Sequence, residues 1–125
     1  MSNSLAGHVA LVTGAQQGIG AAIARAFGAA GAAVVINWLD DQPGAEAVAA
    51  DVRAAGAKVE LVQGSVTDRD AIEAMLAAAD GLGGISILVN NAAIFPRTPF
   101  LELTEADWDS VIDINLRAGF LLAQA

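Results

Sequence analysis

Short apolar runs alternate along this chain with stretches in which apolar residues recur at helical spacing. The apolar runs cover residues 8–12, 33–37, 59–63 and 85–89, and each has the length of a strand. The run at 33–37 does not alternate with polar residues, which predicts a strand buried on both faces of a sheet. The helical stretches carry Ile19, Ala22, Ile23, Ala26, Phe27 and Ala30, then Ala45, Val48, Ala49 and Val52, then Ile72, Met75, Leu76 and Ala79, and last Trp108, Val111, Ile112, Leu121 and Leu122.

Helix-ending and helix-starting residues separate these elements. Gly31 and Gly56 follow the first two helical stretches and suit C-terminal caps. The alternation of strands and helices predicts an α/β fold, a parallel sheet with helices on both faces. The length of 125 residues suits one domain, residues 1–125. Two threonine–acid pairs predict capped starts for the later helices: Thr67 with Asp70, and Thr104 with Asp107.

Composition narrows the class of protein. The chain is 55% hydrophobic, yet no apolar run reaches the roughly 18 residues of a membrane span. It has no cysteine and no apolar leader at its start, so we expect a cytoplasmic protein without membrane partners or a thiolate metal site. The chain has fourteen acidic residues and six scattered basic ones, a balance that argues against a nucleic-acid partner. We also expect no metal site.

The segment TGAQQGIG, Thr13 to Gly20, joins the first strand to the first helix. A helix N-terminus has free N–H groups and a partial positive charge, and glycines let a phosphate approach that backbone closely. The segment therefore predicts a phosphate-binding loop. No Lys-Ser/Thr pair follows the glycines, which argues against a Walker-type nucleotide-triphosphate loop. The alternative is a tight strand-to-helix turn that binds no ligand.

Three motifs together resemble the short-chain dehydrogenase/reductase family. They are the T-G-x-x-x-G-x-G pattern at 13–20, Asn-Asn-Ala-Ala at 90–93, and Asp-Ile-Asn-Leu at 113–116 with Gly119 and Phe120. The resemblance covers nearly the whole chain. It implies a Rossmann-like sheet of about four strands in the order 3-2-1-4. It also implies hydride transfer between the nicotinamide of NAD or NADP and a carbonyl or alcohol substrate.

The resemblance also implies which residues contact the cofactor. Ala93 replaces the more usual glycine, and if this position needs a positive φ the methyl group costs roughly 1 kcal/mol. The alternatives are a simple strand-ending turn at Asn91 and a pure packing role for Gly20. The implied contacts are Gly14, Gln16, Gln17, Gly18, Ile19 and Gly20 along the pyrophosphate, Asn37 and Trp38 at the adenosine ribose, Ser65 and Val66 at the adenine, and Asn91, Ala92 and Ala93 at the nicotinamide ribose.

Charge near the second strand favours NAD over NADP. Asp40 and Asp41 would repel a 2′-phosphate, and Gln17 stands where NADP-binding members often carry a cation. Asn37 can still bond a ribose hydroxyl. The alternative for the two aspartates is a solvated loop and a helix N-cap.

The family's proton-transfer residues are missing from the chain. The family uses a tyrosine, a lysine four residues later and an upstream serine, whereas this chain has no tyrosine and its one lysine is Lys58. Asn115 matches the family's helix asparagine, which holds a water in a proton relay; its alternative is a buried, satisfied polar group that kinks the helix. We therefore expect the N-terminal, cofactor-binding half of an enzyme of about 250 residues, inactive alone.

Two further functions stay open, a non-catalytic dinucleotide-binding module or partner subunit, and a structural role for a degenerate fragment. The substrate is not readable from the sequence. We expect a homo-oligomer, because the fourth strand would form an apolar sheet edge and the last helix would expose Phe120, Leu121 and Leu122.

Overall fold

A computed structural model describes residues 3–125. Strands and helices alternate from the start of the chain to residue 89, and a long helical segment follows. The elements are β1 (Val9–Val12), α1 (Gly18–Ala29), β2 (Ala33–Trp38), α2 (Gln42–Ala54), β3 (Val59–Gln63), α3 (Arg69–Gly81), β4 (Ile87–Val89), a 3₁₀ turn (Phe100–Glu102), α4 (Glu105–Ile112), a π-helical turn (Asp113–Arg117) and α5 (Ala118–Gln124).

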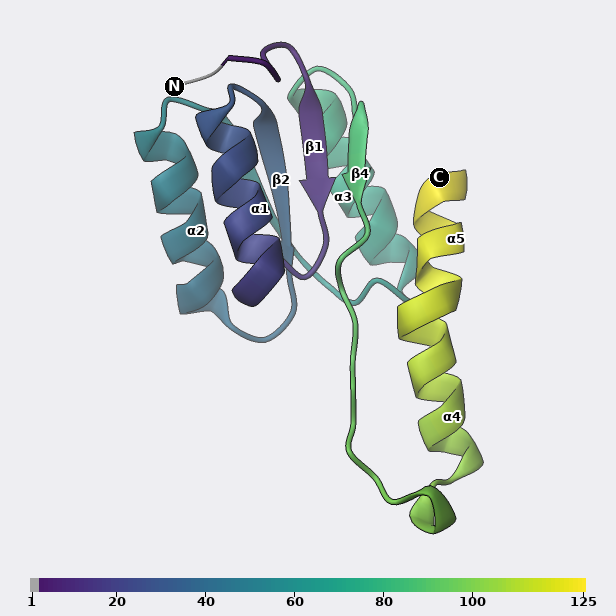
Figure 1. Ribbon diagram of the computed structural model, residues 1–125. Helices are drawn as coiled ribbons and strands as arrows, with labels where there is room; N and C mark the ends of the chain where they lie inside the picture. The colour runs from purple at the N-terminus through teal and green to yellow at the C-terminus, as the bar shows by residue number, and fades with distance from the viewer. Residues whose placement is uncertain (1–2) are drawn as a thin grey trace.

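The four strands form one parallel sheet in the order β3-β2-β1-β4. Helices α1 and α2 cover one face, and α3 and α5 cover the other (Figure 1). Strand β4 lies at the edge and pairs only with β1 within the part of the chain that the structure describes. The Rossmann-like α/β fold and strand order predicted from the sequence are confirmed.

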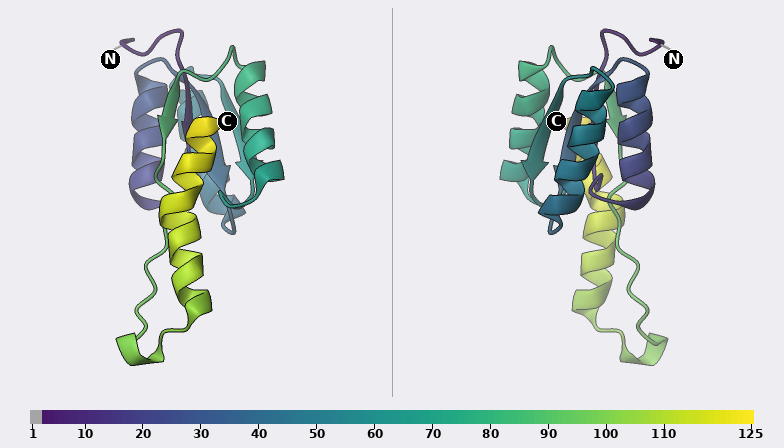
Figure 2. Two further views of the ribbon diagram at one scale, coloured as in Figure 1. Left: turned by 90° about the vertical axis from the view of Figure 1, so that its right-hand side faces the viewer. Right: turned by 90° about the vertical axis from the view of Figure 1, so that its left-hand side faces the viewer.

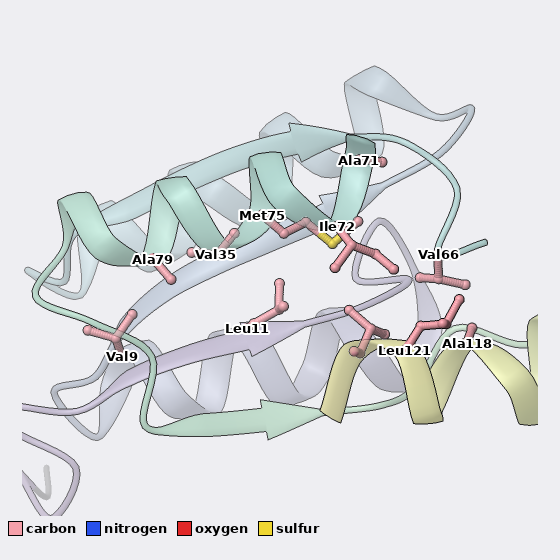
Figure 3. Packing of buried hydrophobic residues seen from close by; sticks show 11 residues of the cluster. Val9, Leu11, Val35, Val66, Ala71, Ile72, Met75, Ala79, Ala118 and Leu121 are labelled. Atoms are coloured by element: carbon pink, nitrogen blue, oxygen red, sulfur yellow. The ribbon is translucent and has the colours of Figure 1, made fainter. Parts of the chain in front are cut away.

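Each face of the sheet carries its own hydrophobic core, because successive strand side chains point to opposite faces. Val9, Leu11 and Val35 face α3 and α5, where they meet Met75 and Leu121 (Figure 3). On the other face Val12, Val34 and Ile36 pack with the buried residues of α1 and α2. The expectation that β2 is buried on both faces is confirmed, since Val34, Val35 and Ile36 have no exposed surface.

The most buried side of α1 is shifted from the one its large apolar residues predict, although Ile23 and Phe27 are half-buried and pack against the core. Ile19 is 73% exposed and Ala22 is exposed, whereas the buried positions are Gly20, Ala21, Ala24 and Gly28. The reason is close packing: a Cβ on Gly28 would come within 2.9 Å of a Val52 methyl group on α2. Only small side chains fit on this side of the helix.

Two predicted boundaries are also wrong. Asp68, not Thr67, caps α3, because its carboxylate accepts a hydrogen bond from the Asp70 N–H at 2.9 Å. Strand β4 begins at Ile87 rather than at residue 85, since the Ser86 hydroxyl and N–H are engaged with the backbone of Val9. The capping box of Thr104 and Asp107 is confirmed at the start of α4.

The C-terminal helical segment has an outer and an inner part. Its inner part, α5, buries Leu121 and Leu122 to 4% exposure, so the expectation that they are bare is wrong. Both belong to the hydrophobic core that α3 and α5 form on that face of the sheet, and Figure 3 shows Leu121 pointing into it. Phe120 is 62% exposed, as expected.

The outer part, α4 with the 3₁₀ turn, extends beyond the sheet (Figure 2). We call residues 94–112 the arm. No helix within residues 3–125 is long and apolar enough to cross a membrane.

Candidate functional site

A cavity of about 460 Å³ opens where the parallel strands end. The loops after β1, β2, β3 and β4 meet there, as expected for the carboxyl edge of such a sheet. Its size falls in the range of small-molecule and cofactor sites. The residues that line it are Gly14, Gln16, Gln17, Gly18, Ile19, Asn37, Leu39, Asp40, Gly64, Ser65, Val66, Asn91, Ala92, Ala93, Ile94 and Ile114.

The three glycines of the β1–α1 loop have two structural roles. Gly14 has φ +61°, and a Cβ there would lie 2.9 Å from the Cα of Ala92. Gly18 has φ +59° and open space around the position of a Cβ. At Gly20 a Cβ would lie 2.5 Å from Asn91 Nδ2 and 2.6 Å from the Gly14 carbonyl oxygen. Gly14 and Gly18 permit the turn, and Gly20 permits close packing of α1 on the loop.

The end of β4 is tied to this loop by Thr13, which is fully buried. Its hydroxyl accepts hydrogen bonds from the N–H groups of Asn91 and Ala92, both at 3.0 Å. In return Asn91 Nδ2 donates to the carbonyl oxygens of Thr13 at 3.1 Å and Gly14 at 3.2 Å. The Thr13 hydroxyl therefore stabilises the loop, and Asn91 packs beneath Gly20.

On the other side of Gly14 lies Asn37, at 2% exposure. Its Oδ1 accepts from the Gly14 N–H at 3.1 Å. Its Nδ2 donates to the carbonyl oxygens of Gly64 at 2.9 Å and Val62 at 3.3 Å. Asn37 at the end of β2 and Asn91 after β4 thus hydrogen-bond the peptide groups of Gly14 from the two sides of β1.

Gln16 joins the glycine loop to the β2–α2 loop. Its Oε1 accepts from the Leu39 N–H at 2.8 Å, and its Nε2 donates to the Asp40 carboxylate at 2.7 Å. Asp40 is the charged side chain among the described residues that line the cavity. Asp41 instead caps α2 by accepting from the Gly44 N–H at 2.9 Å, so the N-cap alternative holds for Asp41.

The remaining predicted contacts are less polar. The Ser65 hydroxyl is paired with the Thr67 hydroxyl at 2.8 Å, and Val66 is buried. Within residues 3–125 every residue with positive φ is a glycine. Ala93 therefore adopts an ordinary conformation, and the strain considered for its methyl group does not arise.

The N-terminus of α1 is open toward the cavity. Gln17 is the N-cap residue and makes no side-chain capping bond. The first backbone bond of the helix runs from the Ala21 N–H to the Gln17 carbonyl. Gln17, Gly18 and Ile19 line the cavity. The partial positive charge of the uncapped α1 N-terminus therefore lies at the cavity wall.

The predicted cofactor residues converge on this cavity, apart from two. Gly20 lies beneath the loop, and Trp38 is half-buried on the α1–α2 side of the sheet. The sequence-based list missed Leu39, Gly64, Ile94 and Ile114, and it assigned Asp40 only an indirect role. Gly64 was detectable, because it directly follows a predicted strand.

Comparison with known proteins decides the family. A family model described as short chain dehydrogenase matches residues 8–125. The chain belongs to the short-chain dehydrogenase family.

Curated short-chain dehydrogenase relatives match nearly all of this chain. A 3-oxoacyl-[acyl-carrier-protein] reductase of Synechocystis is 40% identical over 98% of this chain and 50% of its own length. A galactitol 2-dehydrogenase of Agrobacterium fabrum is 42% identical over 94% of this chain and 44% of its own. The chain thus spans about half the length of the curated relatives it matches.

Solved short-chain dehydrogenase structures share the fold. A dehydrogenase/reductase from Sinorhizobium meliloti superposes with a TM-score of 0.92 at 40% identity, over 98% of this chain and 49% of that one. A short chain dehydrogenase from Burkholderia cenocepacia, in complex with NADP, superposes with a TM-score of 0.92 at 38% identity, over 97% of this chain and 50% of that one.

In this short-chain dehydrogenase chain Asn115 lies in the π-helical turn between α4 and α5. Its Oδ1 accepts from the Ile94 N–H at 2.9 Å, and its Nδ2 donates to the Ile94 carbonyl at 2.8 Å. The residue is exposed, so the alternative of a buried asparagine is wrong. Turns of this kind are frequent at functional sites.

Neither Lys58 nor Ser110 lines the cavity. Lys58 precedes β3 and so lies at the opposite, amino edge of the sheet. Ser110 lines a second hollow of about 350 Å³ with Asp109 and Asp113, beside α4. Among residues 3–125 no cluster of His, Asp and Glu is arranged to hold a metal ion.

Proposed function

We propose that this chain is the dinucleotide-binding half of an NAD(P)-dependent oxidoreductase. The complete protein would move a hydride between the nicotinamide and a carbonyl or alcohol carbon, with a proton moving to or from the oxygen. The observation that supports this most is the meeting of four strand-end loops and an uncapped helix start around one cavity, in a member of the short-chain dehydrogenase family.

The residues present fit a dinucleotide. The backbone of Gln17, Gly18 and Ile19 lies at the helix start, where its N–H groups would hold the pyrophosphate. Gly18 leaves open space on its Cβ side, which permits close approach. Ser65 and Val66 would flank the adenine, and Asn91, Ala92 and Ala93 the nicotinamide ribose. When bound, the cofactor supplies the hydride-transfer chemistry.

We propose NAD as the preferred cofactor. Asp40 adds a negative charge to the cavity beside the end of β2, and no Lys or Arg of the described residues lines it. A 2′-phosphate would be repelled there. The NADP complex of the Burkholderia relative makes NADP the competing candidate.

We place Asn115 in the proton relay, at the turn where it also holds Ile94. The tyrosine, lysine and serine of the family would have to come from outside these 125 residues, because the chain has no tyrosine and Lys58 lies at the wrong edge of the sheet. The chain by itself would then bind the dinucleotide without turnover. The substrate class within carbonyls and alcohols stays open.

A homo-oligomer is also proposed. The arm, the following turn and α5 together expose a set of large apolar side chains outside the core: Phe95, Phe100, Leu101, Trp108, Leu116 and Phe120. An exposed apolar surface of this kind marks an interaction site. The cytoplasmic location expected from the sequence stays a prediction, which cell fractionation would test.

The test is a titration of the complete protein with NADH and with NADPH, followed by the fluorescence of the bound nicotinamide. Tighter binding of NADH supports the proposal, and reduction of NAD by a panel of alcohols establishes the enzyme. Binding of either dinucleotide without turnover on any carbonyl or alcohol would favour the non-catalytic module. Absence of binding to both would contradict the proposed function.

A further inference from the structure

We propose that Asn37 is a positioning residue that sets the shape of the cavity by holding Gly14 and Gly64 at a fixed separation. The inference rests on the proposed dinucleotide-binding function. It differs from the role that the family resemblance implies, a direct hydrogen bond from Asn37 to the ribose.

The place of Asn37 in the sheet makes this possible. Strand β2 lies between β1 and β3. The ladder of β1 with β2 ends at the pair Val12–Ile36, one residue before Asn37. Beyond this point β1 turns into the glycine loop, and the Asn37 side chain continues the connection through the Gly14 N–H at 3.1 Å. The Asn37 carbonyl also accepts from the Ala15 N–H at 2.9 Å.

On its other side the same side chain holds the exit of β3. Both hydrogens of Nδ2 are used, toward Gly64 O at 2.9 Å and Val62 O at 3.3 Å. Gly14 and Gly64 both line the cavity, and they lie on opposite sides of β2. One buried amide therefore connects two walls of the site.

The chemistry of the position requires an amide. The surroundings present one donor, the Gly14 N–H, and two acceptors, the Gly64 and Val62 carbonyls. An amide matches all three, whereas a carboxylate has no hydrogen to donate and an alkyl group has neither donor nor acceptor. Because Asn37 is 2% exposed, an unmatched polar group at this position is costly.

The informative variant is Asn37→Asp in the complete protein. Its neutral carboxyl group can accept from Gly14 and donate to Gly64, but its ionised form would face two carbonyl oxygens. Burial and those oxygens would raise the pKa of the new carboxyl group, so it ionises as the pH rises. NADH should then bind about tenfold more weakly than to wild type near pH 8, and most of the affinity should return near pH 6.

Two controls isolate this effect. Gln124→Glu makes the same amide-to-carboxyl change at the exposed end of α5, outside the cavity, and should leave the NADH affinity unchanged at both pH values. Wild type should bind NADH equally well at both pH values, which controls for any effect of pH that does not depend on the substitution at Asn37.

A second measurement does not depend on any variant. In ligand-free wild type the Gly14 amide should exchange with solvent at least about a hundredfold more slowly than in an unfolded chain, because its acceptor is buried. Free exchange of this amide would overturn the inference even if Asn37→Asp did not fold.

The outcomes separate the inference from the proposed function. An Asn37→Asp variant that binds like wild type at both pH values would overturn the inference alone. So would equal weakening at both pH values, which would indicate direct contact with the ribose. Failure of wild type to bind either dinucleotide would contradict the proposed function, and the inference with it.

Discussion

Asn115 and Ile94 exchange two hydrogen bonds, from the Ile94 N–H to Oδ1 at 2.9 Å and from Nδ2 to the Ile94 carbonyl at 2.8 Å. The two residues lie 21 positions apart, one in the π-helical turn and the other in the segment that follows β4. The pair fixes the start of the arm against the helical segment. Ile94 lines the cavity, so this pair also shapes the site.

Asn115→Ala should loosen the segment after Ile94. Both hydrogen bonds are lost, and trypsin should cleave after Arg97 about tenfold faster than in wild type. Gln124→Ala, on the exposed end of α5, is the matched control and should leave the cleavage rate unchanged. Equal cleavage rates for Asn115→Ala and wild type would contradict this expectation.

If Asn115 also acts in the proton relay, kcat of the complete Asn115→Ala enzyme should fall about tenfold or more while the Kd for NADH stays constant.

Gly20→Ala should destabilise the fold by about 1–3 kcal/mol, because the new methyl group would meet Asn91 Nδ2 and the Gly14 carbonyl oxygen. Gly81→Ala is the control. Gly81 ends α3 with open space around it, so the substitution should be neutral or stabilising by roughly 0.5–1 kcal/mol. Urea unfolding of the complete protein measures both, and equal midpoints for the two variants would refute the packing role of Gly20.

Asp40→Asn should shift the preference toward NADPH. The substitution removes the negative charge but keeps an oxygen that can accept from Gln16 Nε2, so the loop is retained. The ratio of NADPH to NADH affinity should rise about fivefold to tenfold at low salt, and less at high salt. Asp80→Asn, near the far end of α3, is the control with the same charge change. No change in the ratio would mean that Asp40 does not face the 2′-position.

The start of α4 should weaken in acid. The Thr104 N–H, and then its hydroxyl, hold the pKa of Asp107 below its ordinary value of 3.8. A lowered folded pKa gives a stabilising contribution that is complete above the unfolded value and is lost as the pH falls through the folded value. The protection factors of the α4 amides, which correct for the intrinsic pH dependence of exchange, should therefore fall as the pH drops below about 4. Asp107→Asn does not titrate, so it should show no such step; a step of equal size in this variant would exclude Asp107 as its cause.

The arm should carry the oligomer contact. Phe100 is 84% exposed and Leu101 is 94% exposed, so changing both to serine costs the core nothing and removes apolar surface. Sedimentation of the complete protein should show the double variant shifted toward monomer. Ile85→Ser, next to the edge strand β4, separates this contact from strand pairing and should leave the oligomer intact. A monomeric wild type would contradict the proposed oligomer.

Much of the framework was predictable from local pattern. Runs of β-forming residues predicted all four strands, and the glycine loop predicted the place of the cavity. Errors arose where packing partners decide. Ile23 and Phe27 of α1 pack against the core as predicted but Ile19 does not, and the most buried positions are small because Val52 on α2 admits only small residues there.

The sequence by itself determined the order of strands and helices and the loop that opens the first helix. Hydrophobic periodicity and the conformational freedom of glycine act over a few residues, so they are readable in the chain. Only the tertiary structure decided that Asn37 and Asn91 hydrogen-bond Gly14 from two sides. It also decided that Asn115 bonds Ile94 and that Leu121 is buried. These relationships join residues far apart in the chain, and they exist only once the sheet brings its loops to one edge.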